Sequence, residues 1–460
     1  MQGSVSVFLA YVLVFVLAVL FLLLEVSRVW GLEQRAKNDV TMMGNSLLAE
    51  YRTELWESYG LLFLDGTYGT NLFTFSNIEK RGVTLSEDNL SIYGGMTGAI
   101  TPYSWNLYGL HPASVTVTSY GLATDKQGLP FQKEAVRIME NQFTEAALRE
   151  LYELVQNQKT DNTPGVVVEE NSTEIVLSEN PIDVVEGMKQ GECLDHVTDS
   201  TTLSNKQIDL TQTLSKRDLH QGTYLGLEPL GWREKLLFRQ YLETYFACYV
   251  NAKEDHALDY EMEYLIAGKA SDKDNLRAVV NRLILLREAA NLQYLQTDVT
   301  KQELVLAAAT AIGTATLTPE LVPVYKQGLN AAWAYAESIS DIRLLLDGQK
   351  VNVIKTKDQW HTDLTNLAVQ SSGIKQTKGL SYQEYLQILL WTLPDGTLSY
   401  RAMDLIEANT GCAVDTLIYR LEGFVMYQGK PLFSSLVSIG SGRIGQYRFC
   451  ENFCVGYVDD

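Results

Sequence analysis

Residues 7–24 read VFLAYVLVFVLAVLFLLL, and the rest of the chain is organised around this stretch. All eighteen residues are apolar, and the first charged side chain of the sequence is Glu25. At an α-helical rise of about 1.5 Å per residue the stretch spans about 27 Å, close to the hydrocarbon thickness of a bilayer. Apolar side chains all round such a helix are untypical of a core helix. The sequence therefore predicts one membrane-spanning helix, followed by a large domain.

The flanks of this apolar run bear on cleavage and on orientation. A secretory signal has a basic start, a shorter apolar core and a small-residue cleavage site. Residues 1–4 contain no Lys or Arg, and residues 25–30 contain no Ala-x-Ala site, which favours a permanent anchor. Under the positive-inside rule, a cytoplasmic position of the large domain is favoured by the basic residues after the helix, which are Arg28, Arg35 and Lys37.

Composition restricts the classes of partner. The 460 residues carry a formal charge of −19, with 46% hydrophobic residues. That length is enough for two or three cored domains beyond the anchor. The negative charge argues against nucleic acid as a partner and against peripheral binding to anionic lipid. It is typical of a domain that faces an aqueous exterior.

The helical pattern continues beyond the apolar run, and we expect one long helix over residues 4–59. Its second half is amphipathic, because apolar side chains recur at helical spacing. This face is the predicted partner contact, and it consists of Val40, Met43, Leu47, Tyr51 and Leu55. It can pack against the protein's own head or against copies of itself, and a simple membrane stalk fits the same pattern.

The remaining chain predicts an α+β fold, a mostly helical head with small antiparallel sheets. After a transmembrane and juxtamembrane helix at 1–60, we expect a small α+β domain at 61–160, with a strand at 114–119 and a helix over 130–158. An acidic flexible linker follows at 161–205, because prolines, glycines and acidic residues interrupt any periodicity there. Residues 206–350 read as a helical domain. Residues 351–460 read as a C-terminal α+β region, with strands at 416–427, 432–439 and 446–458.

The five cysteines are too few and too scattered for a disulfide scaffold. Cys450 and Cys454 lack the matching second pair that a zinc site needs. The sequence favours buried thiols, and it leaves open one disulfide that involves Cys412, Cys450 or Cys454. An odd count leaves at least one cysteine without a partner in its own chain.

Motifs for catalysis are missing from the sequence. It contains no HExxH pair, no phosphate-binding loop and no Gly-x-Ser-x-Gly elbow. The best metal candidate is a helix face with His256, Asp259 and Glu263. Instead of a metal site, we favour a charged helix face whose acidic side chains form ion pairs with Arg277, Arg282 or Arg287. We therefore predict no catalytic residues, no cofactor and no metal ligands, and a protein that is not an enzyme.

Two sets of residues carry a family resemblance. Residues 3–10 (GSVSVFLA), the apolar helix and residues 25–28 (EVSR) resemble the N-termini of TadE/TadG-like minor pilins of tight-adherence (Flp) pilus systems. An uncharacterised family of Gram-positive membrane-anchored proteins that accompany such systems is similar in several segments, which are 49–51 (AEY), 55–61 (LWESYGL), 258–269 (LDYEMEYLIAGK) and 281–291.

The resemblance implies a pseudopilin-like or accessory subunit of a pilus assembly, with the head outside the cytoplasm, against the count of basic residues. Its implied partners are the lipid bilayer, other pilus or secretion-system subunits, and other copies through the N-terminal helix. Many pilins have a Glu near the start of the apolar run, where this chain has Phe8. Processing between Gly3 and Ser4, and polymerisation, therefore stay open. The alternative function is an anchored surface receptor or adhesin with a ligand-binding head.

Overall fold

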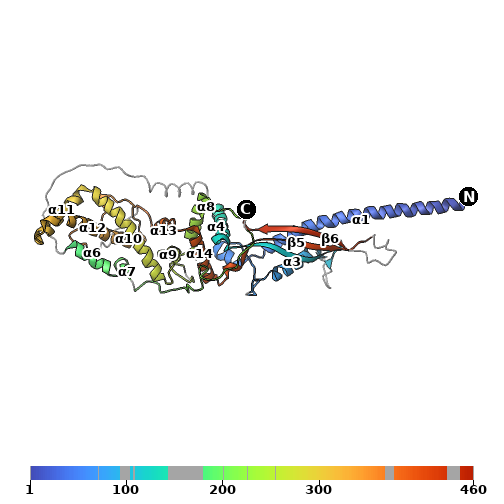
Figure 1. The fold of residues 1–460 in the computed structure, drawn as a ribbon, viewed down its shortest axis with the longest axis horizontal. Helices are drawn as coiled ribbons and strands as arrows, with labels where there is room; N and C mark the ends of the chain where they lie inside the picture. Colours follow the sequence, from blue (N-terminus) through green and yellow to red (C-terminus); the bar gives the residue numbers. More distant parts are fainter. Residues whose placement is uncertain are drawn as a thin grey trace, which may run out of the picture. The chain divides into compact units, whose positions relative to one another are not determined.

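The computed structural model describes residues 2–70, 72–93, 104–106, 109–142, 180–199, 201–224, 226–253, 255–367, 378–432 and 446–458. It confirms the α+β class and divides the chain into two compact units (Figure 1). Unit 1 consists of Met1–Ala135, Leu219–Leu230 and Ala413–Asp460. Unit 2 consists of Val136–Asp218 and Gly231–Cys412.

Unit 1 is built on α1 (Gln2–Leu48), a helix of 47 residues. It is the only helix in the described residues that is long and apolar enough to cross a membrane. The expected end near residue 59 is wrong, because the chain turns after Leu48 and a separate helix, α2 (Thr53–Tyr59), follows. The backbone N–H of Arg52, in this turn, donates to the carbonyl oxygen of Phe63. The chain enters the sheet directly after Phe63.

The sheet of unit 1 joins the two ends of the sequence. Its central strand β5 (Leu417–Gly429) pairs antiparallel with β4 (Leu110–Leu122) on one edge. On the other edge it pairs with β6 (Tyr447–Gly456) and with the short β1 (Leu64–Asp65). A second, two-stranded sheet consists of β2 (Ile92–Tyr93) and β3 (Ser104–Trp105).

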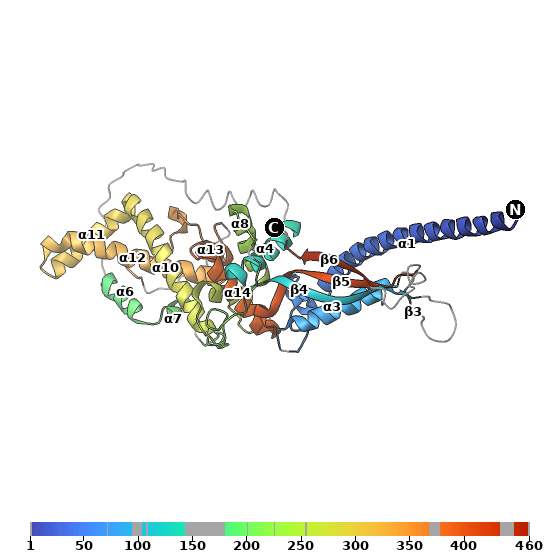
Figure 2. The same ribbon diagram turned by 45° about the vertical axis from the view of Figure 1, so that its right-hand side comes forward.

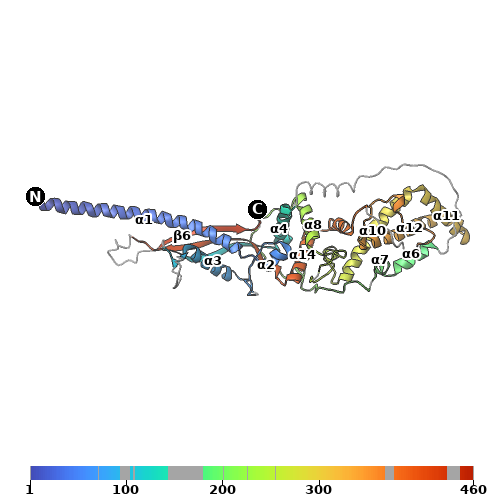
Figure 3. The same cartoon turned by 180° about the vertical axis from the view of Figure 1, so that it is seen from behind.

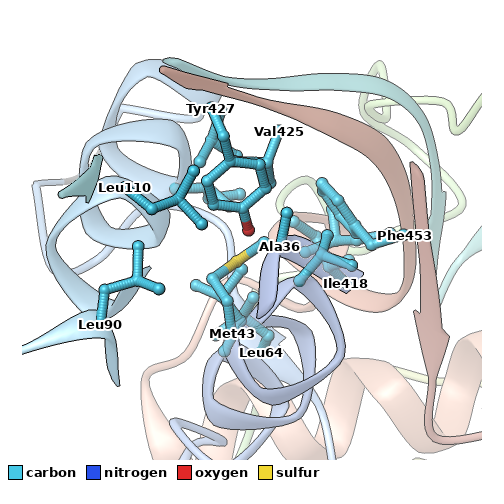
Figure 4. Close-up of a cluster of buried hydrophobic side chains, with 14 of the residues drawn as sticks. Ala36, Met43, Leu64, Leu90, Leu110, Ile418, Val425, Tyr427 and Phe453 are labelled. Carbon is cyan, nitrogen blue, oxygen red and sulfur yellow. The ribbon is translucent and has the colours of Figure 1, made fainter. Parts of the chain in front are cut away.

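The second half of α1 packs on this sheet beside α3 (Phe75–Leu90) (Figure 2). Figure 4 shows side chains of α1, of α3 and of the strands turned towards one another in the shared core. Glycines allow close approach in this core. One of them, Gly44, would bring a Cβ atom to 2.6 Å from Cγ1 of Val455. The helix therefore packs tightly against β6.

Several predicted strands are confirmed, but their assignment to domains is wrong. The strands expected at 114–119, 416–427 and 446–458 correspond to β4, β5 and β6, while most of 432–439 lies outside the described residues. Residues 351–460 do not form one region, because β5 and β6 pair with β4 and belong to unit 1. The stretch 61–160 is likewise shared between the units. No local pattern in the sequence indicates that β4 and β5, which are about three hundred residues apart, pair with each other.

Unit 2 is helical in its described residues. α10 (Asp272–Thr297) and α12 (Val322–Leu346) lie side by side, with α11 (Val299–Ala315) between them in the sequence (Figures 1 and 3). Ser271 caps α10 by accepting a hydrogen bond from the N–H of Asp274. The further helices are α8 (Trp232–Tyr245), α9 (Glu261–Ala267), α13 (Tyr382–Leu390) and α14 (Asp395–Thr410), and α4 (Asp125–Gln142) contains the boundary between the units.

The flexible linker predicted at 161–205 is wrong in its second part. α6 (Pro181–Gln190) begins there with the side chain of Asn180 as its cap and a proline in its first turn, and α7 (Cys193–Val197) follows. Both helices pack on α12. Residues 143–179, which include the rest of the linker and the end of the helix expected over 130–158, lie outside the described residues.

Candidate functional site

The predicted partner face of the N-terminal helix is covered by the protein itself. Val40 is 5% exposed, and Met43 and Leu47 are fully buried against the sheet and α3. Leu55 is also buried, but it lies on α2, and Tyr51 is half-buried in the turn between the two helices. The five residues do not form one free stripe, and in this structure four of them contribute to the protein's own core.

An acidic side chain on the same face of α1 was missed by the sequence analysis. Asp39 is 1% exposed, and its Oδ2 accepts a hydrogen bond of 2.7 Å from the hydroxyl of Tyr427 on β5 and another from Ser86 on α3. Burial raises the pKa of Asp39, and the two hydroxyl donors offset only part of this effect. The carboxylate thus connects the helix to both of its neighbours in unit 1.

The end of the apolar run is also fixed to unit 1. The backbone N–H of Leu432 donates to Oε1 of Glu25 at 3.2 Å, and Nη1 of Arg28 donates to the carbonyl oxygen of Lys430 at 2.8 Å. Beside these contacts lies an apolar groove of about 700 Å³. The groove is lined by side chains of α1 and by one residue of β6, among them Leu17, Phe21, Trp30 and Tyr447. The first turns of α1 include Gly3 and Ser4, of which only the backbone is described.

The metal candidate from the sequence does not assemble in unit 2. Asp259 forms an ion pair of 2.7 Å with Lys206, and Nδ1 of His256 lies 2.9 Å from Glu261. Glu263 is fully buried and accepts hydrogen bonds from the hydroxyl of Tyr382 at 2.7 Å and from a backbone N–H. Burial raises the pKa of Glu263 to about 7.

The expected pairing of these acids with arginines is wrong. Arg277 pairs with Glu192 and Asp274, and Arg282 donates to a backbone carbonyl oxygen. Arg287 pairs with Asp341 on α12. The expected single helix face does not form, because His256 and Asp259 precede α9 and are half-buried, whereas Glu263 lies on α9 and is fully buried.

A second acidic group of unit 2 has the ligand types of a metal site. Glu337 and Asp341 lie one turn apart on α12, and His361 follows in the chain, with one potential ligand atom of each within 4.8 Å of the others. Both carboxylates are fully buried. The ammonium of Lys355, however, contacts Glu337 and lies 2.5 Å from Oδ1 of Asp341. A cation of the protein therefore already neutralises these oxygens, and the group does not fit an additional metal ion.

The electrostatics of this group follow from its partners. Burial alone would raise the pKa of Glu337, but the charge of Lys355 and hydrogen bonds from His361 and Thr362 outweigh it and lower this pKa to about 2. Arg287 donates to Asp341 at 3.0 Å and to the carbonyl oxygens of Asn352 and Val353. Burial opposes the charge of Arg287, but Asp341 outweighs it and raises the pKa of Arg287. The cluster holds α10, α12 and the segment after α12 together.

The surface of unit 2 carries a groove of about 570 Å³ along α6, α7, α10 and α12. Its charged side chains are paired with one another. Arg277 lies 3.0 Å from Glu192, and Lys189 lies 3.6 Å from Glu288 and 4.5 Å from the ring centre of Tyr335. The groove offers both charges to a ligand without a net excess of either sign.

All five cysteines are present as thiols, so the structure contains none of the disulfides that the sequence left open. Cys248 and Cys412 are buried, and burial raises the pKa of Cys248 to about 12, which makes its thiol inert. Cys193 is half-buried, whereas Cys450 and Cys454 are exposed on β6. The prediction of buried thiols thus holds for two of the five cysteines.

Comparisons with known proteins give one match. A family model described as a family of unknown function (DUF5702) matches residues 171–422, which is more than half of the chain. The matched part comprises most of unit 2 and the start of β5. No curated protein and no solved structure matches.

Proposed function

We propose that this chain, which belongs to the family of unknown function DUF5702, is a single-pass membrane protein that acts as a non-enzymatic accessory subunit of a pilus-like, tight-adherence assembly. The observation that carries the proposal is the continuity of α1. Its apolar half is exposed, and its other half is the centre of the unit 1 core. Unit 1 is thus joined to the apolar segment by one continuous helix, which suits a subunit held at the membrane surface.

In this proposal, partners contact the first half of α1. Large apolar side chains are exposed over residues 5–24, including Leu13 and Leu23, whereas the originally predicted face is buried. In a bilayer, helices associate through van der Waals packing of their apolar surfaces. We therefore place the contact with other subunits, or with further copies, in the membrane.

The orientation of the head is part of the proposal. The net charge of −19 and the TadE/TadG-like N-terminus favour an extracytoplasmic head. Protease treatment of wall-stripped cells tests it, with a known cytoplasmic protein and a known surface protein as controls. Digestion of the head before lysis supports the proposal. Protection of the head, while the surface protein is cut, overturns it.

Photo-crosslinking on α1 tests the partners. A crosslinking residue at Leu13 or Leu23, which are 60% and 62% exposed, should capture membrane subunits of the tight-adherence system, and deletion of the chain should impair pilus assembly. A crosslinker at Met43, which is buried on the same helix, is the matched control and should give only intramolecular products. Unimpaired assembly, with lipid as the only product at Leu13 and Leu23, would contradict the assembly role.

The second candidate function is an anchored receptor or adhesin. It is supported by the groove of about 570 Å³ in unit 2, which presents charged and aromatic side chains to solvent. If it is correct, Arg277→Ala and Glu288→Ala should abolish attachment of cells to their surface ligand and leave pilus assembly unchanged.

A further inference from the structure

The outer edge of β6 carries two exposed cysteines in a self-complementary arrangement. Cys450 and Cys454 point away from the core, as does Asn452 midway between them. Among the described residues, β6 pairs with β5 along its whole length and with no strand on its other edge. An edge strand of this length is a template for pairing with another chain.

The hydrogen-bond pattern shows which backbone groups face this open edge. The N–H of Tyr457 donates to the carbonyl oxygen of Tyr419 at 3.0 Å, directly beyond the partners Gly456 and Arg420. Hydrogen-bonded pairs alternate along an antiparallel ladder, so the odd-numbered residues of β6 bond to β5. The even-numbered residues, which include both cysteines and Asn452, therefore turn their N–H and C=O groups to the outer edge.

We propose that β6 pairs antiparallel with β6 of a second copy about a two-fold axis at Asn452, and that this pairing is locked by two symmetric disulfides. In this register Cys450 lies opposite Cys454 of the second copy, and Cys454 lies opposite Cys450. Residues that form a hydrogen-bonded antiparallel pair have Cα atoms about 5.5 Å apart, which is within the usual range for a disulfide. The proposal goes beyond the proposed function and is independent of pilus partners.

The neighbouring residues are compatible with this register. Glu451 would lie opposite Phe453, and Arg448 opposite Gly456, so no like charges face each other. Bridges within one chain are not an alternative for this pair. Two residues four apart on a strand are about 13 Å apart, well beyond the reach of a disulfide.

The chemistry requires a disulfide as the oxidant, such as oxidised glutathione. The thiolate of Cys454 attacks one sulfur of oxidised glutathione, and one glutathione leaves. The thiolate of Cys450 from the second copy then attacks the mixed disulfide and displaces the second glutathione. Each bridge thus converts two thiols and one oxidised glutathione into one disulfide and two glutathiones. The guanidinium of Arg420 donates to Sγ of Cys454 at 3.0 Å, and this sulfur also lies 3.7 Å from Oε1 of Glu422, so both a cation and a carboxylate face the thiol.

The test uses the full chain purified in detergent, treated with oxidised glutathione and separated on a denaturing gel without reductant. The wild-type chain should give a covalent dimer that a reductant dissolves. Neither Cys450→Ser nor Cys454→Ser should form it alone, because each bridge needs one cysteine of each kind. A mixture of the two variants, tagged to differ in size, should restore a mixed dimer through one bridge. Cys193→Ser is the control and should dimerise like the wild type.

Two results would overturn the proposal. One is a covalent dimer of either single variant alone, and the other is the absence of the mixed dimer. Asn452→Pro tests the strand pairing separately, since a proline there removes an N–H that faces the outer edge and leaves the ladder with β5 intact. It should reduce dimer formation at least tenfold without a change in the unfolding temperature of unit 1. An unchanged dimer yield would exclude pairing through the edge.

Discussion

In unit 1 the buried carboxylate of Asp39 accepts its hydrogen bonds from hydroxyl groups, among them that of Tyr427, whereas in unit 2 Glu337 and Asp341 lie against the ammonium of Lys355. The first arrangement leaves a negative charge with neutral donors, and burial raises the pKa of Asp39. The second supplies a counter-charge and lowers the pKa of Glu337 to about 2. Two cores of one chain thus bury acids at very different electrostatic cost.

The comparison indicates which substitutions should destabilise each unit most. Protonation of a carboxylate that has hydroxyl donors costs little unfolding free energy, because the neutral acid is still hydrogen-bonded. A carboxylate with a buried ammonium cannot lose its partner without leaving a charge in an apolar interior, which is far more costly. We therefore expect the largest mutational effects in unit 2.

The largest effect is expected for Lys355→Met. It leaves Glu337 and Asp341 without the cation between them, and breaking such a buried pair typically costs about 3–5 kcal/mol of unfolding free energy. Urea unfolding followed by tryptophan fluorescence measures the loss. The control Lys357→Met removes an exposed lysine of the same segment and should change the free energy by less than about 0.5 kcal/mol. Equal stability of the two variants would show that the cluster is not held by charge.

The next effect concerns Glu263, a buried acid of unit 2. Its carboxylate accepts a hydrogen bond from a tyrosine hydroxyl, as does that of Asp39 in unit 1. The pKa of Glu263 is about 7 in the folded protein against an ordinary value of 4.5, because of burial. Between these values the folded state binds more protons than the unfolded state, so stability falls as the pH rises from 4.5 to 7. Up to about 3 kcal/mol of unfolding free energy is lost over this window.

Glu263→Gln removes this titration while it keeps an oxygen that can accept from Tyr382. We expect the decline in unfolding free energy between pH 5 and 7.5 to be smaller in this variant than in the wild type. Glu320→Gln, at an exposed position, should keep the wild-type decline. Glu337 should behave in the opposite sense, because its lowered pKa adds stability above pH 4.5 that is lost as the pH falls towards 2. Parallel pH profiles of wild type and Glu263→Gln would disprove the assignment.

A moderate effect is expected for Tyr427→Phe in unit 1. The variant removes the 2.7 Å hydrogen bond to Asp39 and leaves the buried carboxylate with one donor fewer, at a cost of about 1.5–3 kcal/mol of unfolding free energy. A double-mutant cycle with Asp39→Asn measures the coupling. If the hydroxyl donates to a charged group, the loss on removing it should be larger in the wild type than in the Asp39→Asn background. An equal loss in both backgrounds would mean that Asp39 is neutral in the fold.

The difference between the units was only partly predictable from the sequence. The apolar run at 7–24 and the strands β4 and β5 follow from local patterns. Asp39 carried a signal that was overlooked, since it lies three residues after Ala36 and four before Met43, on the buried face of the helix. Its partners could not be deduced, because Tyr427 is almost four hundred residues away in the sequence.

The same reasoning applies to the cluster in unit 2. Glu337 and Asp341 stand four apart on one face of a helix whose second half is mostly apolar, which suggests that both are buried. Nothing local identifies Lys355 as their counter-charge, because it lies in an irregular segment whose path depends on tertiary packing. The division into units was missed for a similar reason, since it depends on β5 returning to the sheet of the N-terminal residues.

The smallest effects distinguish two glycines in the second half of α1, of which one has open space beside it and the other is enclosed by the core of unit 1. At Gly31 an added Cβ meets nothing within 4 Å, so Gly31→Ala should stabilise the helix by about 0.5–1 kcal/mol. At Gly44 the same atom would approach Cγ1 of Val455 to 2.6 Å. Overpacking costs about 1–3 kcal/mol and exceeds the helical gain, so Gly44→Ala should destabilise unit 1 by about 1 kcal/mol. Thermal unfolding of the two variants in detergent should therefore shift in opposite directions. Shifts of the same sign would place both glycines in one environment, and Gly44 would then not be enclosed against β6.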